Sequence, residues 1–283
     1  MDALTFFGLE RTDDPARWRM PIVPGLTSGR RALFGGAGLG ACIEVLEQLT
    51  GRPLVWATAQ YLTYATPPSV LELDAVEVVR GHHISQARVI AHVGDAEVLT
   101  VLAALGNRPF ADEGQWAKRP DVPGPEDCPP REHHNAMDDT IRSRLEERVA
   151  RGRPFWELPG EQGDGNSAIW VRLPDVLEMS AAALAIVGDF VPSGIGQALG
   201  RRAGGNSLDN TLRVAHRVPT DWVLADIRVQ AVADGFGHGL VHLWAEDGTL
   251  LGTASQSTIV RSWRDAPAPP TADDTDGTLE PRT

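Results

Sequence analysis

Three polar side chains in the second half of the chain could take part in acid–base chemistry or hold a water molecule. Asp209 stands just before a strand-like run, where a carboxylate can deprotonate a water or serve as a solvated turn acceptor. Gln230 shares a predicted strand face with Asp226 and Arg228, as an exposed polar residue would. The sequence pattern places the Gln256 amide among small and apolar residues. An amide buried there without hydrogen-bond partners would cost about 1–3 kcal/mol, which suggests that Gln256 has a function. Its neighbours on the same side of an alternating pattern are small or apolar: Leu250, Gly252, Ala254, Thr258 and Val260.

The histidines and cysteines do not form a pattern typical of a metal site. His82 follows Arg80-Gly81 at a predicted strand boundary, and no further ligands stand nearby at suitable spacing. We therefore interpret it as a loop residue. The two cysteines, Cys42 and Cys128, are far apart and lack any C-x-x-C spacing, which argues against a disulfide framework and a thiolate zinc site.

Composition limits the class of protein. A chain of 283 residues, 42% of them apolar, is long enough for two domains of ordinary size. No run approaches the roughly 20 apolar residues that span a bilayer, so we expect a soluble protein without a membrane partner. The first residues lack the features of a secretory signal, and a cytoplasmic location is the expectation. The formal charge of −12 argues against nucleic acid as a partner.

Two similar runs of elements flank a proline-rich stretch. In the first half, a helix begins at Phe34-Gly35-Gly36 and precedes strand-like runs at 56–64, 70–79, 84–93 and 97–105. In the second half, a helix over 175–189 precedes runs at 207–214, 222–231, 239–244 and 250–261. A Gly/Asp turn recurs at a separation of about 152 residues, which indicates a duplicated module. The order predicts an α+β fold with two antiparallel sheets, each wrapped around a central helix.

The composition also predicts the boundaries of these modules. We expect an N-terminal module over 1–111, a linker over 112–165 and a C-terminal module over 166–263 that carries the site. The linker contains a short predicted helix over 138–149, with Ile141, Leu145 and Val149 spaced four residues apart. Residues 264–283, rich in Pro, Asp and Thr, are predicted to be a disordered tail.

The order of elements and three short motifs resemble the thioesterase II family of acyl-CoA thioesterases. The motifs are Phe34-Gly35-Gly36, residues 80–89 (RGHHISQARV) and residues 246–251 (EDGTLL). The resemblance covers most of residues 20–110 and 170–263. It implies a double hot-dog fold, hydrolysis of acyl-CoA to fatty acid and coenzyme A, a place in lipid metabolism, and no metal or organic cofactor. It also implies pairing of modules through their sheets, so a homodimer is possible.

The resemblance further implies a site in the C-terminal module made of an Asp, a Ser or Thr, and a Gln that hold a water against the thioester. We match the Asp to Asp209 and the Gln to Gln256. A gapless count of 26 residues back from Gln256 matches the hydroxyl residue to Gln230, which departs from the family pattern. At the separation of about 152 residues, the first-half counterparts of these three residues are the apolar residues Ala57, Val78 and Ala104, to within one position.

Substrate contacts are expected in the first module. Backbone N–H groups at Phe34-Gly35-Gly36 could stabilise an oxyanion, because glycine permits close approach to a helix start. Arg80 and His82 could contact the phosphates of coenzyme A, although solvation is an alternative role. An acyl-CoA or acyl-carrier binding protein with weak catalysis is the alternative function. A hydratase of the same fold would need an Asp/His pair, which the sequence does not show.

Overall fold

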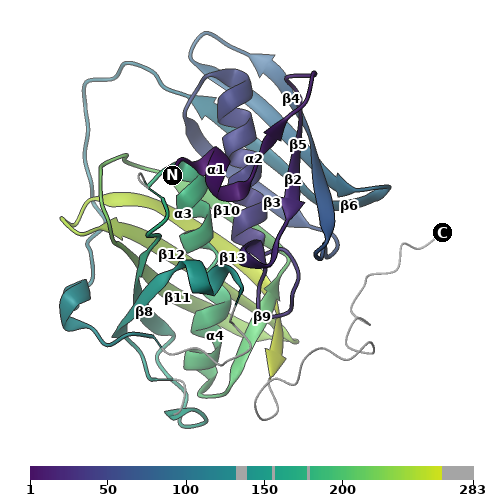
Figure 1. The fold of residues 1–283 in the computed structure, drawn as a ribbon. Helices are drawn as coiled ribbons and strands as arrows, with labels where there is room; N and C mark the ends of the chain where they lie inside the picture. The colour runs from purple at the N-terminus through teal and green to yellow at the C-terminus, as the bar shows by residue number, and fades with distance from the viewer. Residues whose placement is uncertain (132–138, 155–156, 177–178, 263–283) are drawn as a thin grey trace.

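The computed structural model describes residues 1–131, 139–154, 157–176 and 179–262. Within these ranges the strands form one antiparallel sheet of 13 strands, with helices packed against its inner face (Figure 1). Antiparallel strands around central helices confirm the predicted α+β double hot-dog fold. The predicted tail over 264–283 lies outside the described residues.

The first half contains the central helix and the strands that sequence alternation predicted. Strands β3 to β6 match the four predicted runs to within three residues at each end, whereas α1, β1 and β2 were not predicted. In chain order the elements are α1 (Ala3–Phe7), β1 (Glu10–Arg11), β2 (Arg17–Ile22), η1 (Pro24–Leu26), α2 (Gly35–Thr50), β3 (Leu54–Tyr61), β4 (Ser69–Arg80), β5 (Ile84–Val93) and β6 (Ala96–Gly106).

The second half repeats this order with additions. Its elements are η2 (Pro125–Asp127), η4 (Ile141–Arg144), β7 (Glu146–Arg151), β8 (Asn166–Arg172), α3 (Ala181–Gly188), α4 (Val191–Leu199), β9 (Ala203–Ser207), β10 (Asp209–Val214), β11 (Val223–Ala233), β12 (Phe236–Ala245) and β13 (Leu250–Ser262). The predicted helix over 175–189 is observed as α3, and the second helical segment, α4, was not predicted.

Strands β3 and β10 join the two modules into a single sheet. The strand order is β1-β2-β4-β5-β6-β3-β10-β13-β12-β11-β8-β7, and β9 pairs with β13. At the junction Thr58 lies directly opposite Thr211, and their hydroxyl oxygens are 2.7 Å apart. These two threonines are 153 positions apart in the chain, close to the spacing of the predicted duplication. The junction therefore brings equivalent strands of the two modules side by side.

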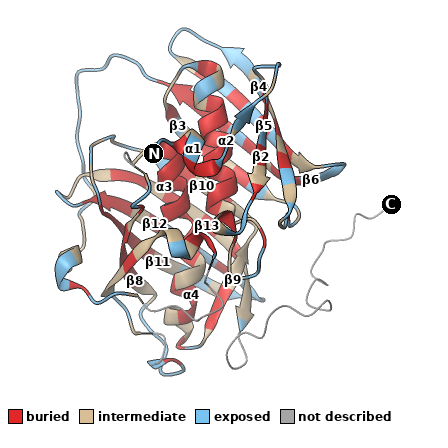
Figure 2. Cartoon of the chain, viewed as in Figure 1, coloured by how far each residue is buried: buried red, intermediate tan, exposed pale blue. Residues whose placement is uncertain are grey.

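Small residues allow α2 and α3 to pack closely where the two modules meet. A Cβ atom on Gly36 would lie 2.6 Å from the carbonyl oxygen of Ala185, and one on Gly40 would lie 2.6 Å from that of Ala182. Any side chain at either glycine would push the helices apart. Both helices are buried along most of their length (Figure 2).

The helical stretch Ala181–Leu199 is interrupted between α3 and α4. Asp189 ends α3 and Phe190 precedes α4, which has a proline, Pro192, in its first turn. Proline favours this position because the N–H that it lacks has no partner within the helix. Within the described residues this stretch alone is long and apolar enough to cross a membrane, but 72% of its most apolar window is buried. It is a core element, and its interruption places Asp189 inside the fold.

The linker contains a strand where a helix was predicted. Residues 146–151 form β7, which pairs with β8 at the edge of the sheet in the second module. Residues 141–144 form the short helix η4. The spacing of Ile141, Leu145 and Val149 was misleading because so short a helix is marginal without packing, and the ladder to β8 provides better pairing. Residues 146–151 therefore belong to the second module.

Described linker residues, among them Ala117, Val122 and Cys128, pack on the outer face of the sheet in the second module. Cys128 packs there with a cluster of buried residues from the sheet and the loop before it: Ala168, Trp170, Trp222, Leu224 and Trp244. The Trp170 indole Nε1 donates a hydrogen bond to the carbonyl oxygen of Pro123 at 2.9 Å. This face is consequently a second small core.

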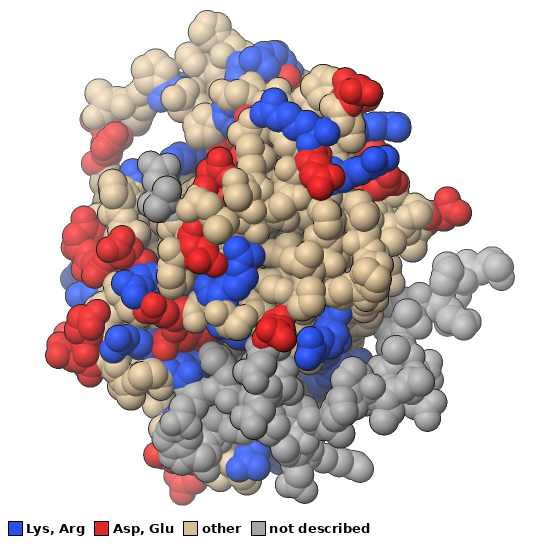
Figure 3. All heavy atoms as spheres, viewed as in Figure 1, with Lys and Arg blue, Asp and Glu red and all other residues tan. Residues whose placement is uncertain are grey.

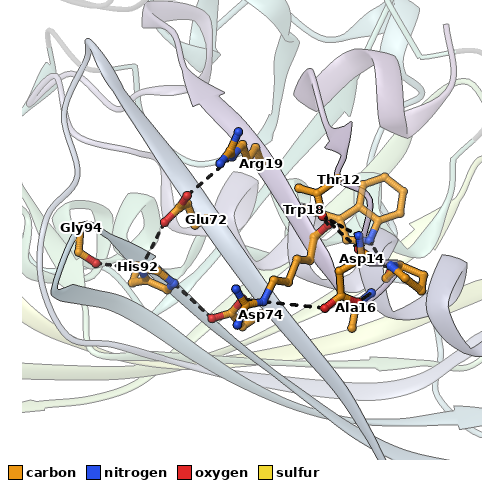
Figure 4. A network of polar contacts seen from close by, with 11 residues as sticks. Thr12, Asp14, Ala16, Trp18, Arg19, Glu72, Asp74, His92 and Gly94 are labelled. Carbon is orange, nitrogen blue, oxygen red and sulfur yellow. Dashed lines mark hydrogen bonds and ion pairs between the residues drawn. The ribbon is translucent and has the colours of Figure 1, made fainter.

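Polar contacts link β2 to β4 and β4 to β5 in the first module (Figure 4). Arg19 on β2 lies 3.6 Å from Glu72 on β4, and His92 on β5 lies 3.2 Å from Asp74. Such partly exposed pairs contribute little stability. Acidic and basic side chains are interspersed over the face seen in Figure 3.

Candidate functional site

A buried polar cluster lies where α3, α4, β9 and β13 meet. Asp189 and Gln256 are 4% and 3% exposed, and Ser207 is partly buried beside them. The Gln256 amide Nε2 donates to Asp189 Oδ1 and, at 3.0 Å, to Ser207 Oγ. The Ser207 hydroxyl in turn donates to Asp189 Oδ1 at 3.1 Å. The three side chains form a closed hydrogen-bonded ring.

Two helix N-termini point at this cluster. The backbone N–H of Gly36, in the first turn of α2, donates to Asp189 Oδ2 at 2.7 Å. The N–H of Val191, the first residue of α4, donates to Gln256 Oε1 at 3.1 Å. The positive end of a helix dipole favours a nearby anion, so α2 and α4 both stabilise a charged Asp189.

A glycine on β12 allows α4 to begin beside Gln256. Gly239 pairs with Gln256 across the sheet, and a Cβ on Gly239 would lie 2.7 Å from the Val191 side chain. Because Gly239 has no Cβ atom, the start of α4 packs directly against the sheet, within hydrogen-bonding distance of Gln256. The site is therefore positioned by a close helix–sheet contact.

The acidity of Asp189 is shifted toward the neutral range. Burial raises the pKa of its carboxyl to about 6, while hydrogen bonds from Gln256, Gly36 and Ser207 and the charge of Arg142 act in the opposite direction. A carboxylate with this pKa is largely ionised at pH 7 but is a stronger base than an exposed aspartate. This is the range in which a general base works best.

Arg142 from η4 is a cation whose charge acts to lower the pKa of Asp189. Its guanidinium lies 4.3 Å from the ring centre of Phe190 and 6.0 Å from that of Phe34, the residues that precede α4 and α2. It also donates to Ser193 Oγ at 3.3 Å and pairs with the buried Glu147. Arg142 thus links the linker to both helix starts.

Of the three predicted catalytic residues, the structure brings only Gln256 into this cluster. Asp209 is partly buried, and its Oδ1 accepts a hydrogen bond from the Ser257 backbone N–H at 2.8 Å. Side chains alternate along a strand, and Asn210 takes the inward position next to it. Gln230 is exposed at a β-bulge in β11, where its amide donates at 3.4 Å to the Arg228 carbonyl oxygen.

The predicted substrate-binding residues fall into two separate groups. Gly35 and Gly36 lie at the start of α2 beside Asp189, and Phe34, which precedes them, packs against Arg142. Arg80 donates to the carbonyl oxygen of Thr50 at the opposite end of α2, and the neighbouring His82 is exposed. At 1.5 Å per residue, the helix separates these groups by roughly 22 Å.

Sequence reasoning missed Asp189 and Ser207. Asp189 was treated as the end of a predicted helix, yet Pro192 shortly after it is a signal for a new helix start. Ser207 was included in a predicted strand, but the gapless count from Gln256 selected Gln230 instead. With these two residues the cluster contains an Asp, a hydroxyl residue and a Gln, the set that the family resemblance implied.

Acid–base chemistry suits these residues, and the surroundings offer no obvious metal ligands. Among the described residues, no group of three His, Cys, Asp or Glu side chains gathers in a metal-binding arrangement. A carboxylate accepts about four hydrogen bonds, and Asp189 receives two on Oδ1 and one on Oδ2. Oδ2 can therefore accept one more, from a water or a substrate group.

Comparisons with known proteins show the family of this chain and agree with its fold. A family model described as the acyl-CoA thioesterase C-terminal domain matches residues 125–260. A solved structure of a candidate thioesterase from Novosphingobium aromaticivorans is 33% identical, with a TM-score of 0.79 over 90% of this chain and 98% of that one. The chain belongs to the acyl-CoA thioesterase family, as the sequence resemblance predicted. A comparison with curated proteins gives no significant match.

More distant structures share the fold. A thioesterase II from Thermobifida fusca is 15% identical, with a TM-score of 0.78 over 92% of this chain and 99% of that one. An acyl-CoA thioesterase II, TesB2, from Mycobacterium marinum is 18% identical, with a TM-score of 0.72 over 92% and 98%. These matches agree with the double hot-dog architecture.

Proposed function

We propose that this protein hydrolyses acyl-CoA thioesters to free fatty acid and coenzyme A, with Asp189, Ser207 and Gln256 as the hydrolytic residues. Asp189 takes the place that the sequence had suggested for Asp209, and Ser207 that of Gln230. The observation that carries the proposal is the buried ring of these three side chains at two helix N-termini. The products make this a reaction of lipid metabolism.

In the proposed mechanism, Asp189 is the general base. A water hydrogen-bonded to Oδ2 gives its proton to the carboxylate as its oxygen bonds to the thioester carbonyl carbon. The tetrahedral intermediate then collapses, the carbon–sulfur bond breaks, and the coenzyme A thiolate takes the proton back from Asp189. No acyl-enzyme forms, because the nucleophile is water.

Ser207 and Gln256 hold the base in place. Gln256 has no ionisable group, and its amide connects Asp189 Oδ1 to the start of α4. Ser207 gives Oδ1 its second hydrogen bond, which leaves Oδ2 to face the water. Such positioning reduces the reorganisation that the reaction would otherwise require.

Release of free thiol from acyl-CoAs of graded chain length tests the proposal. We expect turnover with at least one chain length, followed through a thiol-reactive dye, with heat-denatured protein as the control. An acyl-CoA binding protein would instead bind these compounds in calorimetry and release no thiol. Binding without turnover across the series would replace hydrolysis with that alternative.

A further inference from the structure

A tyrosine hydroxyl lies buried beside Asp189 without a partner. Tyr61 is the last residue of β3, and its backbone N–H donates to the Leu208 carbonyl oxygen at 3.0 Å. Its side-chain oxygen is buried and hydrogen-bonds to no residue within the described part of the chain. Burying a hydroxyl without a hydrogen bond is unfavourable, so this group calls for an explanation.

Gly35 places this hydroxyl next to the proposed base. A Cβ built on Gly35 would lie 2.8 Å from Asp189 Oδ2 and 3.1 Å from the Tyr61 hydroxyl oxygen. Both oxygens therefore lie close to the same point beside Gly35, at the start of α2. Because Gly35 carries no side chain, Asp189 Oδ2 and the Tyr61 hydroxyl can both approach the start of α2.

A second buried amide lies on the neighbouring strand. Asn210 on β10 is 0% exposed, and neither atom of its amide has a hydrogen-bond partner among the residues described. Burial, and then the charge of Asp189, raise the pKa of Tyr61 well above its ordinary value. The Asn210 side chain lies near the hydroxyl and acts in the opposite direction, although the two groups do not meet in hydrogen-bond geometry. The hydroxyl consequently keeps its proton at any pH at which the enzyme works and can act as a donor.

We propose that Tyr61 is a further catalytic residue, whose hydroxyl donates a hydrogen bond to the thioester carbonyl oxygen of bound acyl-CoA. This inference rests on the proposed hydrolysis. The water held by Asp189 Oδ2 attacks the carbonyl carbon while the Tyr61 hydroxyl binds the carbonyl oxygen. The substrate supplies the acceptor that the free protein lacks.

The hydroxyl stabilises charge and transfers no proton. As the water oxygen bonds to the carbonyl carbon, the electrons of the C=O π bond move to the carbonyl oxygen, which becomes an oxyanion. The Tyr61 hydrogen bond strengthens as that charge develops. When the carbon–sulfur bond breaks, the electrons return to the C=O bond and Tyr61 is unchanged.

Tyr61→Phe removes only this hydroxyl and tests the proposal. We expect kcat to fall about 10²-fold, the usual loss for one oxyanion donor, with KM changed less than about threefold. The melting temperature should stay the same or rise, since the lost group has no partner. The matched control is Tyr64→Phe, because the other tyrosine of the chain is exposed and bonds to Asn206. That variant should keep full turnover.

Binding of two unreactive analogues gives a readout that does not depend on turnover. One is a ketone analogue of acyl-CoA with a methylene in place of sulfur, and the other is an S-alkyl-CoA thioether without the carbonyl. Wild type should bind the ketone more tightly, and Tyr61→Phe should lose most of that preference. Full kcat in Tyr61→Phe, or an unchanged preference, would overturn the role of Tyr61 alone. An inactive wild type would overturn the proposed hydrolysis and this role with it.

Discussion

The two modules pair symmetrically about the β3–β10 junction, but the second has a polar site where the first has apolar residues. Thr58 and Thr211 occupy equivalent positions at the junction. Across the sheet, Thr211 pairs with Ser255, which precedes Gln256, and Thr58 pairs with Leu102, which precedes Ala103. The equivalent of Gln256 in the first module is therefore a buried alanine. Likewise Asp189 precedes the Phe190 cap of α4, and the residue before the Phe34 cap of α2 is a leucine.

The first module nevertheless contributes to the site of the second. It supplies the Gly36 N–H that binds Asp189, the bare Cα of Gly35, and the Tyr61 hydroxyl. The second module supplies the base and the residues that hold it. The two modules therefore supply different parts of one site, and the start of α2 in the first module completes the cluster of the second.

The largest expected effect is on kcat, and it distinguishes Asp189 from Asp209 as the general base. Asp189→Asn should lower kcat about 10³-fold, because the amide cannot accept a proton from water. Asp209→Asn is the matched control, since its amide oxygen can still accept the Ser257 N–H, and it should stay within about threefold of wild type. Thiol release measures both. The reverse result would return the role of base to Asp209.

The next effect concerns the contact between modules. Gly36→Ala should lower the free energy of unfolding by about 1–3 kcal/mol, because its Cβ would meet the backbone of α3. Gly38→Ala in the same helix meets only side-chain atoms, of Leu33 at 3.3 Å and of Leu99 at 3.5 Å, and should be neutral or stabilising. Chemical denaturation compares the two variants. Equal stabilities would show that the modules are not packed as tightly as described.

A smaller effect is expected at the hydroxyl of the cluster. Ser207→Ala should reduce kcat about tenfold, since Asp189 Oδ1 loses one of its two hydrogen bonds. Ser207→Thr keeps the hydroxyl and should retain most activity. Unchanged turnover in the alanine variant would remove Ser207 from the hydrolytic set.

The pH dependence tests the acidity of Asp189. Its pKa of about 6 predicts that kcat/KM falls about tenfold between pH 7 and pH 5, as the base becomes protonated. Stability should change in the opposite sense, because the folded state holds this proton more tightly than the unfolded chain. The free energy of unfolding should therefore decrease as pH rises from about 4 to about 6. The difference between wild type and Asp189→Asn isolates this contribution, and a flat difference would contradict the raised pKa.

Sequence alone predicted much of the fold and one residue of the cluster. Alternating apolar residues located β3 to β6 and β10 to β13, because each of these strands has one face on the core. Strand β2 was missed because its pairing with β4 depends on a partner distant in sequence, and the edge strand β7 was missed because the spacing of its apolar residues predicted a helix. Gln256 could be found because an amide stands out among small apolar residues. Asp189 could not, because its role depends on a helix interruption that brings it against Gly36, 153 positions away.

That same contact has a consequence for the order of events during synthesis. The first module contains its own helix and strands and can begin to fold as it leaves the ribosome. Its helix start, however, finds its partner only after Asp189 has emerged, and the cluster closes only with Gln256, near the end of the described chain. Hydrolytic competence is therefore acquired late, and a chain truncated before β13 would have a folded first half with no complete site.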